Sequence, residues 1–176
     1  MENEIVFRRL GPSDTKKYRS LRLECLRDFP ENFGATLASE AARPKLRMEI
    51  AIEAESPTKF VIGAFSDQTL IGQVAIYQEE NPRQLHVGQV VQMYVQPQFS
   101  GQKVGLNMLK FAIASAWEIE ALEQLRLEVV TTSLSAIHVY QQAGFEQNGV
   151  YKQQMKIGNI YKDAIAMVLF KTGMAS

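Results

Sequence analysis

One stretch of the sequence, residues 90–106, constrains the fold more than any other. It reads as an apolar strand ending at Val95, a loop broken by Pro97, and a turn with Gly101 and Gly105 that opens a long helix. The first N–H groups of a helix lack internal partners, and the helix dipole places partial positive charge there. Such a turn can bind an anion, so a phosphate-bearing cofactor is the first hypothesis. An ordinary strand–loop–helix joint without a ligand is the alternative.

Apolar side chains recur at helical spacing after this turn. Val104, Met108 and Phe111 lie three or four residues apart, and the series continues to Ile119. This spacing predicts an amphipathic helix with one buried face. Ser100 is predicted to be its N-cap, because a serine hydroxyl can accept a hydrogen bond from an early helix N–H.

Length and charge limit the kinds of partner. Of the 176 residues, 46% are hydrophobic and 22% are charged, so residues 1–176 are expected to form a single globular domain with one core. Lysine plus arginine total 19, and aspartate plus glutamate also total 19. No net charge therefore attracts nucleic acid or an anionic membrane. We expect a small-molecule partner, with no nucleic acid and no membrane.

Neither secretion nor metal binding is indicated. The N-terminus carries Glu2 and Glu4 where a signal peptide would carry bases, and no apolar run approaches membrane-spanning length, so a cytoplasmic location is predicted. Cys25 is the only cysteine and shares helical spacing with apolar neighbours, which favours a buried thiol over a nucleophile. With only His86 and His138 as histidines, no metal site is expected.

Alternating strand and helix patterns fill the rest of the chain. The hairpin formed by 59–65 and 70–77 is expected to have a loop of about four residues, and the long strand 85–95 is expected at the centre of the sheet. The predicted fold class is α+β, with a mixed sheet of about seven strands and about four helices. Other strands are expected at 5–7, 124–130, from 145, 151–155 and 161–170. Helices are expected up to 28, over 45–55, after the predicted N-cap Ser100 and over 135–143.

The order of these elements and three motifs resemble the GCN5-related N-acetyltransferases (GNAT), which move an acetyl group from acetyl-CoA to an amine. The resemblance covers nearly the whole chain and implies a single-domain GNAT-like fold with a mostly antiparallel seven-stranded sheet. The motifs are 93–97 with 100–105, similar to the family's pyrophosphate-binding pattern; 133–145, similar to its Asn, Ala, Leu-Tyr and Gly-Phe segment; and 161–163 with Met167, similar to its closing strand.

Three positions depart from the family's pattern. Ser100 stands where the family usually has Arg or Gln, Lys103 replaces the central glycine, and Ser133 replaces the usual Asn. The Lys103 side chain can crowd the phosphates or pair with them through its ammonium group. A helical conformation at Lys103 would keep its backbone N–H in the phosphate site, and retained cofactor binding is the favoured interpretation.

The resemblance implies acetyl-CoA as the acetyl donor. Exposed backbone of the strand before the loop would pair with the pantetheine arm, and a backbone N–H there would donate to the thioester oxygen. The residues implied in cofactor binding are Met93, Tyr94, Val95, Ser100, Gly101, Gln102, Lys103, Val104, Gly105, Leu106, Ser133 and Tyr140.

Tyr140 is the best-matched catalytic residue, because many family members present a phenol hydroxyl from this position to the departing sulfur. The alternative is a helix residue with its ring in the core. The identity of the general base stays open, since the strand ending at Val95 lacks the family's usual Glu. The candidates are His86, which can otherwise be a solvated residue, and Glu128, which can act through water or only make a structural hydrogen bond.

The acceptor pocket is expected between residues 29–40, the helix over 45–55 and the hairpin near Asn159. Phe29 and Phe33 are candidate pocket walls, and Glu40 can attract a cationic amine or serve as a third base; core packing and solvation are the alternatives. Small-molecule and peptide amines both stay open as substrates: polyamine, amino acid, aminoglycoside, peptide N-terminus and lysine.

Two functions of different classes follow. The first is an N-acetyltransferase that works by direct attack in a ternary complex, because Cys25 lies far in sequence from the cofactor motif. The second is a non-catalytic CoA-binding or regulatory protein with a degenerate phosphate loop, which Lys103 and Ser133 favour and Tyr140 opposes. The resemblance also implies a homodimer, because members of the family often dimerise. Apolar residues 165–170 can contribute to its interface or can instead be internal core, so the oligomeric state stays open.

Overall fold

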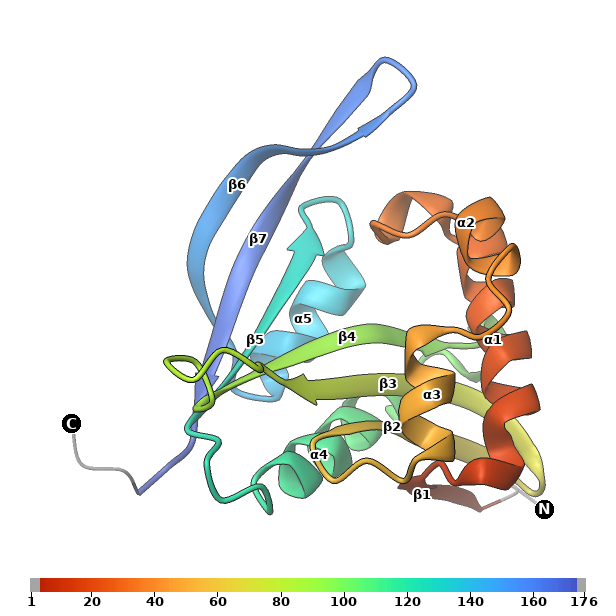
Figure 1. Cartoon of the computed structure of the whole chain (residues 1–176). Helices are drawn as coiled ribbons and strands as arrows, with labels where there is room; N and C mark the ends of the chain where they lie inside the picture. Colours follow the sequence, from red (N-terminus) through yellow and green to blue (C-terminus); the bar gives the residue numbers. More distant parts are fainter. Residues whose placement is uncertain (1–3, 174–176) are drawn as a thin grey trace.

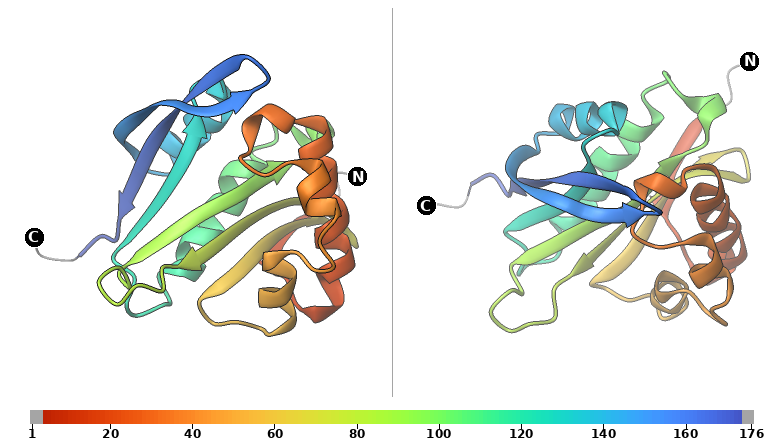
Figure 2. Two further views of the ribbon diagram at one scale, coloured as in Figure 1. Left: turned by 45° about the horizontal axis from the view of Figure 1, so that its top comes forward. Right: turned by 90° about the horizontal axis from the view of Figure 1, so that it is seen from above.

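A computed structural model describes residues 4–173, in which seven strands form one sheet between helices (Figure 1, Figure 2). The strands are β1 Ile5–Arg9, β2 Lys59–Ser66, β3 Thr69–Gln78, β4 Val87–Val95, β5 Gln124–Val130, β6 Glu146–Ile157 and β7 Ile160–Phe170. Their order in the sheet is β1-β2-β3-β4-β5-β7-β6. Only β4 and β5 pair parallel, and all other neighbours pair antiparallel.

Helices cover both faces of this sheet. Helices α1 (Thr15–Asp28) and α3 (Arg47–Glu53) pack on β3 and β2, with the short α2 (Leu37–Ala41) beside α1. Helix α4 (Val104–Ala116) packs on the other side of β2 and β3, next to α5 (Leu134–Gln142). Three short 3-10 helices complete the described chain: η1 Pro12–Asp14, η2 Pro30–Asn32 and η3 Pro97–Phe99.

The hydrophobic core is divided by the sheet into two clusters. One lies under α1 and α3 and contains Tyr18, Cys25 and Tyr94. The other lies under α4 and α5 and contains Met108 and Tyr140. Because both faces are covered, β2 and β3 are buried along nearly their whole length. The predicted burial of Cys25 is confirmed at 0% exposure, and burial raises the pKa of its thiol to about 12.

The predicted α+β class, the mixed seven-stranded sheet and the central place of the long fourth strand are confirmed. Three details differ. The loop of the β2–β3 hairpin consists of Asp67 and Gln68 alone, because both strands extend further than their apolar runs. The strands expected from 145 and at 151–155 form a single strand, β6. Helix α2 was not predicted, since its five residues are too few to show a periodicity.

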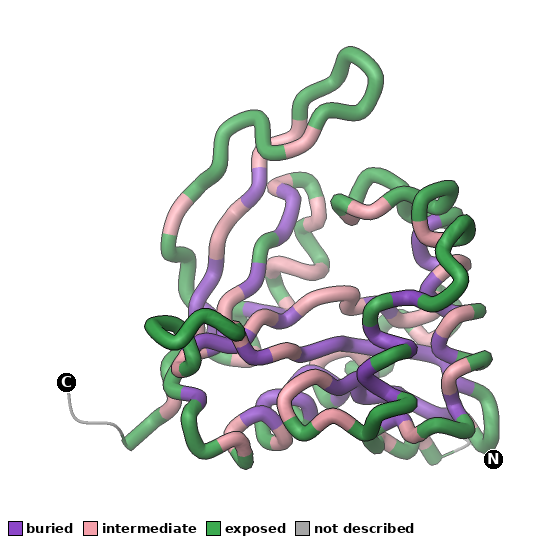
Figure 3. Tube along the Cα trace, viewed as in Figure 1, coloured by how far each residue is buried: buried purple, intermediate pink, exposed green. Residues whose placement is uncertain are grey.

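The β6–β7 hairpin extends beyond the body of the sheet, and its tip is exposed (Figure 1, Figure 3). Strand β7 lies between β5 and β6, so residues 165–168 pair on both edges within the sheet, whereas Leu169 and Phe170 pair with β5 alone. Within residues 165–170, Met167 and Val168 are buried, while Phe170 is exposed. The edge strands of the sheet are therefore β6 and, at the other end, β1, and the homodimer stays a prediction. Among the described helices, none has the length and apolar character needed to cross a membrane.

Candidate active site

The central strands separate from each other part way along the sheet. Strand β4 pairs with β5 only through residues 87–89, which face 124–126. From Val90 to Val95 the β5 side of β4 has no strand partner, and Figure 1 shows the two strands diverging there. Backbone N–H and C=O groups at such an edge can pair with an extended ligand.

A bulge in β4 lies at this separation. Between the pairs Gln73–Tyr94 and Ala75–Val91, β4 spans one more residue than β3. Gln92 lies within this bulge and has a φ of 58°, a value that few residues other than glycine adopt. The hydroxyl of Tyr18 donates a 2.7 Å hydrogen bond to Oε1 of Gln92. The bulge thus directs backbone groups of β4 away from the regular ladder.

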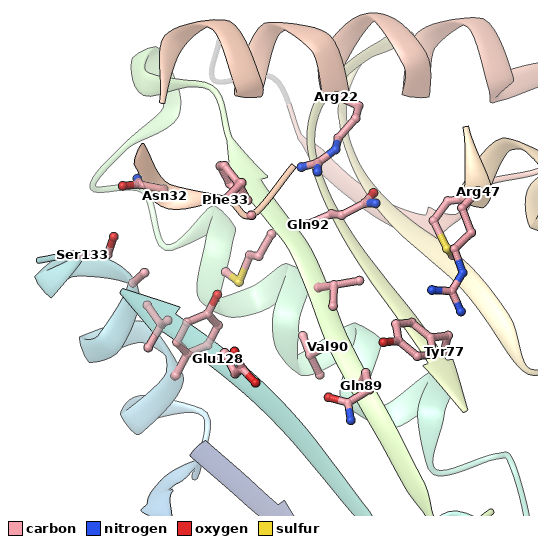
Figure 4. A pocket seen from close by; sticks show the side chains of 17 residues that line it. Arg22, Asn32, Phe33, Arg47, Tyr77, Gln89, Val90, Gln92, Glu128 and Ser133 are labelled. Carbon is pink, nitrogen blue, oxygen red and sulfur yellow. The ribbon is translucent and has the colours of Figure 1, made fainter. Parts of the chain in front are cut away.

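A cavity of about 450 Å³ occupies the gap between the two strands (Figure 4). Its walls come from α1, β3, β4, β5, α5, the segment around Phe33 and the start of α3. The lining residues are Arg22, Asn32, Phe33, Gly34, Arg47, Met48, Tyr77, Gln89, Val90, Val91, Gln92, Met93, Glu128, Val129, Ser133, Ala136 and Tyr140. The cavity therefore connects the α5 side of the sheet with the α1 and α3 side.

Tyr140 enters this cavity from α5. It is 8% exposed, and its ring packs edge-on against Phe145 with the centroids 6.1 Å apart. No described residue forms a hydrogen bond with its hydroxyl. Burial raises the pKa of the phenol to about 12, so the group stays protonated near neutral pH and can donate a hydrogen bond.

Of the two candidate bases, Glu128 lines the cavity and His86 does not. Glu128 is exposed on β5, lines the cavity, and accepts a 3.0 Å hydrogen bond from Nε2 of Gln154. His86 lies in the turn before β4 and does not line the cavity; its backbone oxygen accepts from the N–H groups of Glu123 and Gln124 at 2.9 and 3.1 Å. Only Glu128 is brought near the separated strands.

The predicted phosphate loop follows β4 directly. Helix α4 begins at Val104, with Lys103 as N-cap at φ 58° and ψ 14°, and no side chain caps it. The first α4 turn closes with the 3.0 Å hydrogen bond from Asn107 N–H to the Lys103 oxygen, so the N–H groups of residues 104–106 have no partner within the helix. Ser100 ends η3 instead, and its prediction as N-cap is wrong.

The reason for this shift is the backbone of the loop. Gly101 has a φ of 79° and Lys103 is left-handed, so the chain turns twice before the helix starts. Lys103 thus keeps the conformation that glycine favours, although its side chain carries a Cβ. That side chain is exposed. A Cβ at Gly105 would lie 3.3 Å from Cε of Met93, which shows how closely the helix start packs on β4.

The other residues expected to bind the cofactor are placed as follows. The Met93 and Ser133 side chains line the cavity. Tyr94 is 6% exposed in the core under α1, and its hydroxyl donates a 3.0 Å hydrogen bond to Glu24, so only its backbone faces the strand separation. Val95 is partly buried and packs in the core under α4.

Of the three residues expected in the acceptor pocket, only Phe33 lines a cavity. Phe33 lines the cavity and also a second cavity of about 730 Å³ beside the β6–β7 hairpin. Phe29 instead packs against Tyr94, with the ring centroids 5.9 Å apart, and lines neither cavity. Glu40 forms an ion pair of 3.3 Å with Arg43 and also lies outside both cavities.

Sequence reasoning missed several lining residues, among them Arg22, Arg47, Tyr77 and Gln92. A signal for Arg22 exists, because it lies four residues after Tyr18 on the apolar face of α1. A charged residue in an apolar stripe is an exception that indicates a special environment.

The acetyltransferase (GNAT) family model matches residues 20–145, well over half of the chain. Among solved structures, an acetyltransferase of the GNAT family from Streptococcus pneumoniae has a TM-score of 0.81 at 20% identity, covering 96% of this chain and 100% of that one. The structure of yncA from Salmonella typhimurium with its cofactor acetyl-CoA has a TM-score of 0.79 at 13% identity, covering 98% and 97%.

A ribosomal-protein-alanine N-acetyltransferase from Brucella melitensis has a TM-score of 0.75 at 15% identity, covering 94% and 99%. At these identities the likeness shows the fold, and the family match carries the assignment. The chain belongs to the GNAT family and is an acyltransferase whose acetyl donor is acetyl-CoA.

Proposed function

We propose that this protein is an N-acetyltransferase that acetylates a primary amine by direct attack in a ternary complex. The observation that carries the proposal is the cavity between β4 and β5, which joins the cofactor side of the sheet, with Tyr140, to the opposite side, with Phe33 and Arg47. Two substrates that enter from opposite sides can meet at the bulge of β4. Such an arrangement lowers the barrier by holding the reacting atoms together.

The residues on the α4 side fit acetyl-CoA. The unpartnered N–H groups of residues 104–106 suit the pyrophosphate, and Ser100, Gly101, Gln102 and Lys103 form the turn before them. The unpaired edge of β4 at residues 93–95 suits the pantetheine arm. Ser133 and Tyr140 would contact the thioester end from α5.

When bound, acetyl-CoA supplies a thioester carbonyl that a neutral amine can attack. A backbone N–H at the β4 bulge would stabilise negative charge on the carbonyl oxygen. Tyr140 would give its hydroxyl proton to the departing sulfur, which its protonated state allows. Glu128 would receive the amine proton through water, since it lines the cavity and is exposed.

A covalent acetyl-enzyme is disfavoured by the place of the only cysteine. Cys25 is fully buried in the core under α1, and burial raises the pKa of its thiol to about 12. A protonated, inaccessible thiol is a poor nucleophile. No second thiol exists in the sequence.

Calorimetric titration with acetyl-CoA, with CoA and ATP as controls, tests the proposal together with thiol release in the presence of amines. Micromolar binding of acetyl-CoA in preference to ATP, followed by amine-dependent thiol release, is the expected result. Binding without transfer to any amine would favour the non-catalytic alternative, and no binding would contradict both.

A cytoplasmic location and a homodimer remain part of the proposal. The edge strand β6 offers unpaired backbone, and Val150 and Tyr151 on it are exposed. Edge pairing between two copies would cover these side chains. Light scattering coupled to size-exclusion chromatography would give the mass, and a monomer at micromolar concentration would contradict the dimer.

A further inference from the structure

Arg22 is a buried cation for which the described chain provides no counterion. It is 3% exposed, and its Nε and Nη1 atoms have no hydrogen-bond partner. No ion pair of the described residues includes it. Burying a guanidinium in this way is costly, and buried arginines are normally paired.

The acidic side chains near this part of α1 are already engaged. Glu49 accepts from Arg19 at 2.8 Å and from the Leu46 N–H at 2.5 Å. Glu24 accepts from Tyr94 and Gln96, and Glu40 pairs with Arg43. The Cys25 thiol beside Arg22 stays neutral, because burial raises its pKa to about 12. The charge of Arg22 is therefore left for a group from outside the chain.

The guanidinium points into the active-site cavity. Figure 4 shows Arg22 reaching from α1 toward Gln92, beside Phe33. Its Cζ lies 5.2 Å from the centre of the Phe33 ring, so the ring covers part of the guanidinium and water is restricted. A second guanidinium, that of Arg47, lies at the exposed edge of the cavity over the Tyr77 ring at 4.6 Å.

We propose that Arg22 binds the carboxylate of the acceptor, so that the acceptor is a small amine with its own carboxylate, of the amino-acid class. This inference rests on the proposed acetyl transfer and names its substrate. The planar fork of an arginine matches a carboxylate with two parallel hydrogen bonds. Two arginines in the cavity disfavour polyamines and aminoglycosides, which are polycations. A peptide N-terminus lacks a carboxylate next to its amine.

Matched acceptors test the inference. The standard α-amino acids, short ω-amino acids, the carboxamide of each, and spermidine would be compared by acetyl-CoA-dependent thiol release. At least one carboxylated amine should exceed its carboxamide in kcat/KM by about tenfold or more, the difference expected for a hydrogen bond to a charged group. Spermidine should be a poor substrate. Equal or better use of carboxamides or spermidine would overturn the inference.

Variants of Arg22 separate recognition from folding. Arg22→Gln should abolish the preference by lowering kcat/KM much more for the carboxylated amine than for its carboxamide, whereas a purely structural defect would lower both in the same proportion. Arg22→Lys should retain part of the preference, because lysine keeps the positive charge but lacks the planar guanidinium fork. Lys16→Gln makes the same charge change on an exposed site of α1 and should leave the preference unchanged.

The two proposals fail in different ways. Loss of acetyl-CoA binding, or no transfer to any amine, would contradict the proposed function. Normal acetyl-CoA binding with transfer only to amines that lack a carboxylate would leave the proposed function standing and overturn the role of Arg22. A carboxylate preference that survives Arg22→Gln would also overturn that role.

Discussion

The hydroxyl of Tyr18 donates a 2.7 Å hydrogen bond to Oε1 of Gln92, across 74 positions of the chain. This bond connects α1 with the bulge of β4. Gln92 has a φ of 58°, a backbone conformation that costs a residue with a side chain about 1–2 kcal/mol. The hydrogen bond offsets about 1 kcal/mol of that cost. The unpaired edge of β4, which we propose binds the cofactor, therefore depends on α1.

Removing this hydroxyl with Tyr18→Phe should lower the free energy of unfolding by about 1–2 kcal/mol, because the amide oxygen of Gln92 loses its partner. The affinity for acetyl-CoA should fall a few-fold, since the bulge is held less firmly. Urea denaturation and calorimetry measure the two effects. The matched control is Tyr151→Phe, which removes a hydroxyl from an exposed tyrosine. Equal unfolding free energies of the two variants would contradict the role of the Tyr18–Gln92 hydrogen bond.

Replacing the candidate proton donor with Tyr140→Phe should reduce kcat by about a hundredfold while the Kd for acetyl-CoA changes little. The ring and its contact with Phe145 are kept, so only the hydroxyl group is lost. Because burial raises the pKa of the phenol to about 12, ionisation of Tyr140 should not limit the wild-type rate below about pH 10. A parallel loss of kcat and affinity would argue against this assignment.

Two substitutions at the left-handed Lys103 can distinguish the effect of its ammonium charge from the effect of its backbone conformation. Lys103→Gly should raise the free energy of unfolding by up to about 1 kcal/mol, because glycine adopts φ 58° without strain. Lys103→Ala keeps the strain and removes the ammonium group. If that group pairs with phosphate, both variants should bind acetyl-CoA about two- to fivefold more weakly, as expected for an exposed ion pair. Unchanged affinity in both would show that the backbone N–H groups alone bind the phosphates.

Much of the fold could be predicted because it depends on local patterns. The strand, loop and helix over 90–106 show their apolar periodicity directly, and the two-strand hairpin over 59–78 is read from two apolar runs. The N-cap of α4 could not be predicted from apolar periodicity. The left-handed turns at Gly101 and Lys103 delay the helix to Val104, and nothing in the residue type of Lys103 indicates a positive φ.

The candidate site was harder to predict because it joins distant segments. Tyr140 and Glu128 were found from a motif and a strand pattern, and both line the cavity. Arg22 and Gln92 line the same cavity from α1 and β4, two elements far apart in the sequence, which no local spacing reveals. His86 was chosen for its chemistry, but the strand places it at the far end from the bulge.

The ion pair between the exposed Arg8 and the buried Asp14 makes stability depend on pH. Asp14 is 3% exposed and accepts from Arg8 at 2.7 and 2.9 Å and from the Gly11 N–H at 2.9 Å. The Arg8 hydrogen bonds, aided by that of Gly11 and opposed by burial, lower the pKa of Asp14 in the folded state. A lowered carboxyl pKa adds stability above the pKa of the unfolded state, and this stability is lost as the pH falls through the folded pKa.

Asp14→Asn should therefore lower the free energy of unfolding by about 1–2 kcal/mol at neutral pH, because the charged acceptor of these bonds is lost. The difference from wild type should be complete above about pH 5 and shrink below about pH 4, where Asp14 becomes protonated in the unfolded state. It should vanish only below the lowered pKa of the folded state, where Asp14 is protonated in both states. Urea denaturation across this range measures it, with Asp28→Asn as the control, since its ion pair with Arg27 is exposed. If the difference in unfolding free energy between wild type and Asp14→Asn does not change with pH, the charge of Asp14 is not what stabilises the turn.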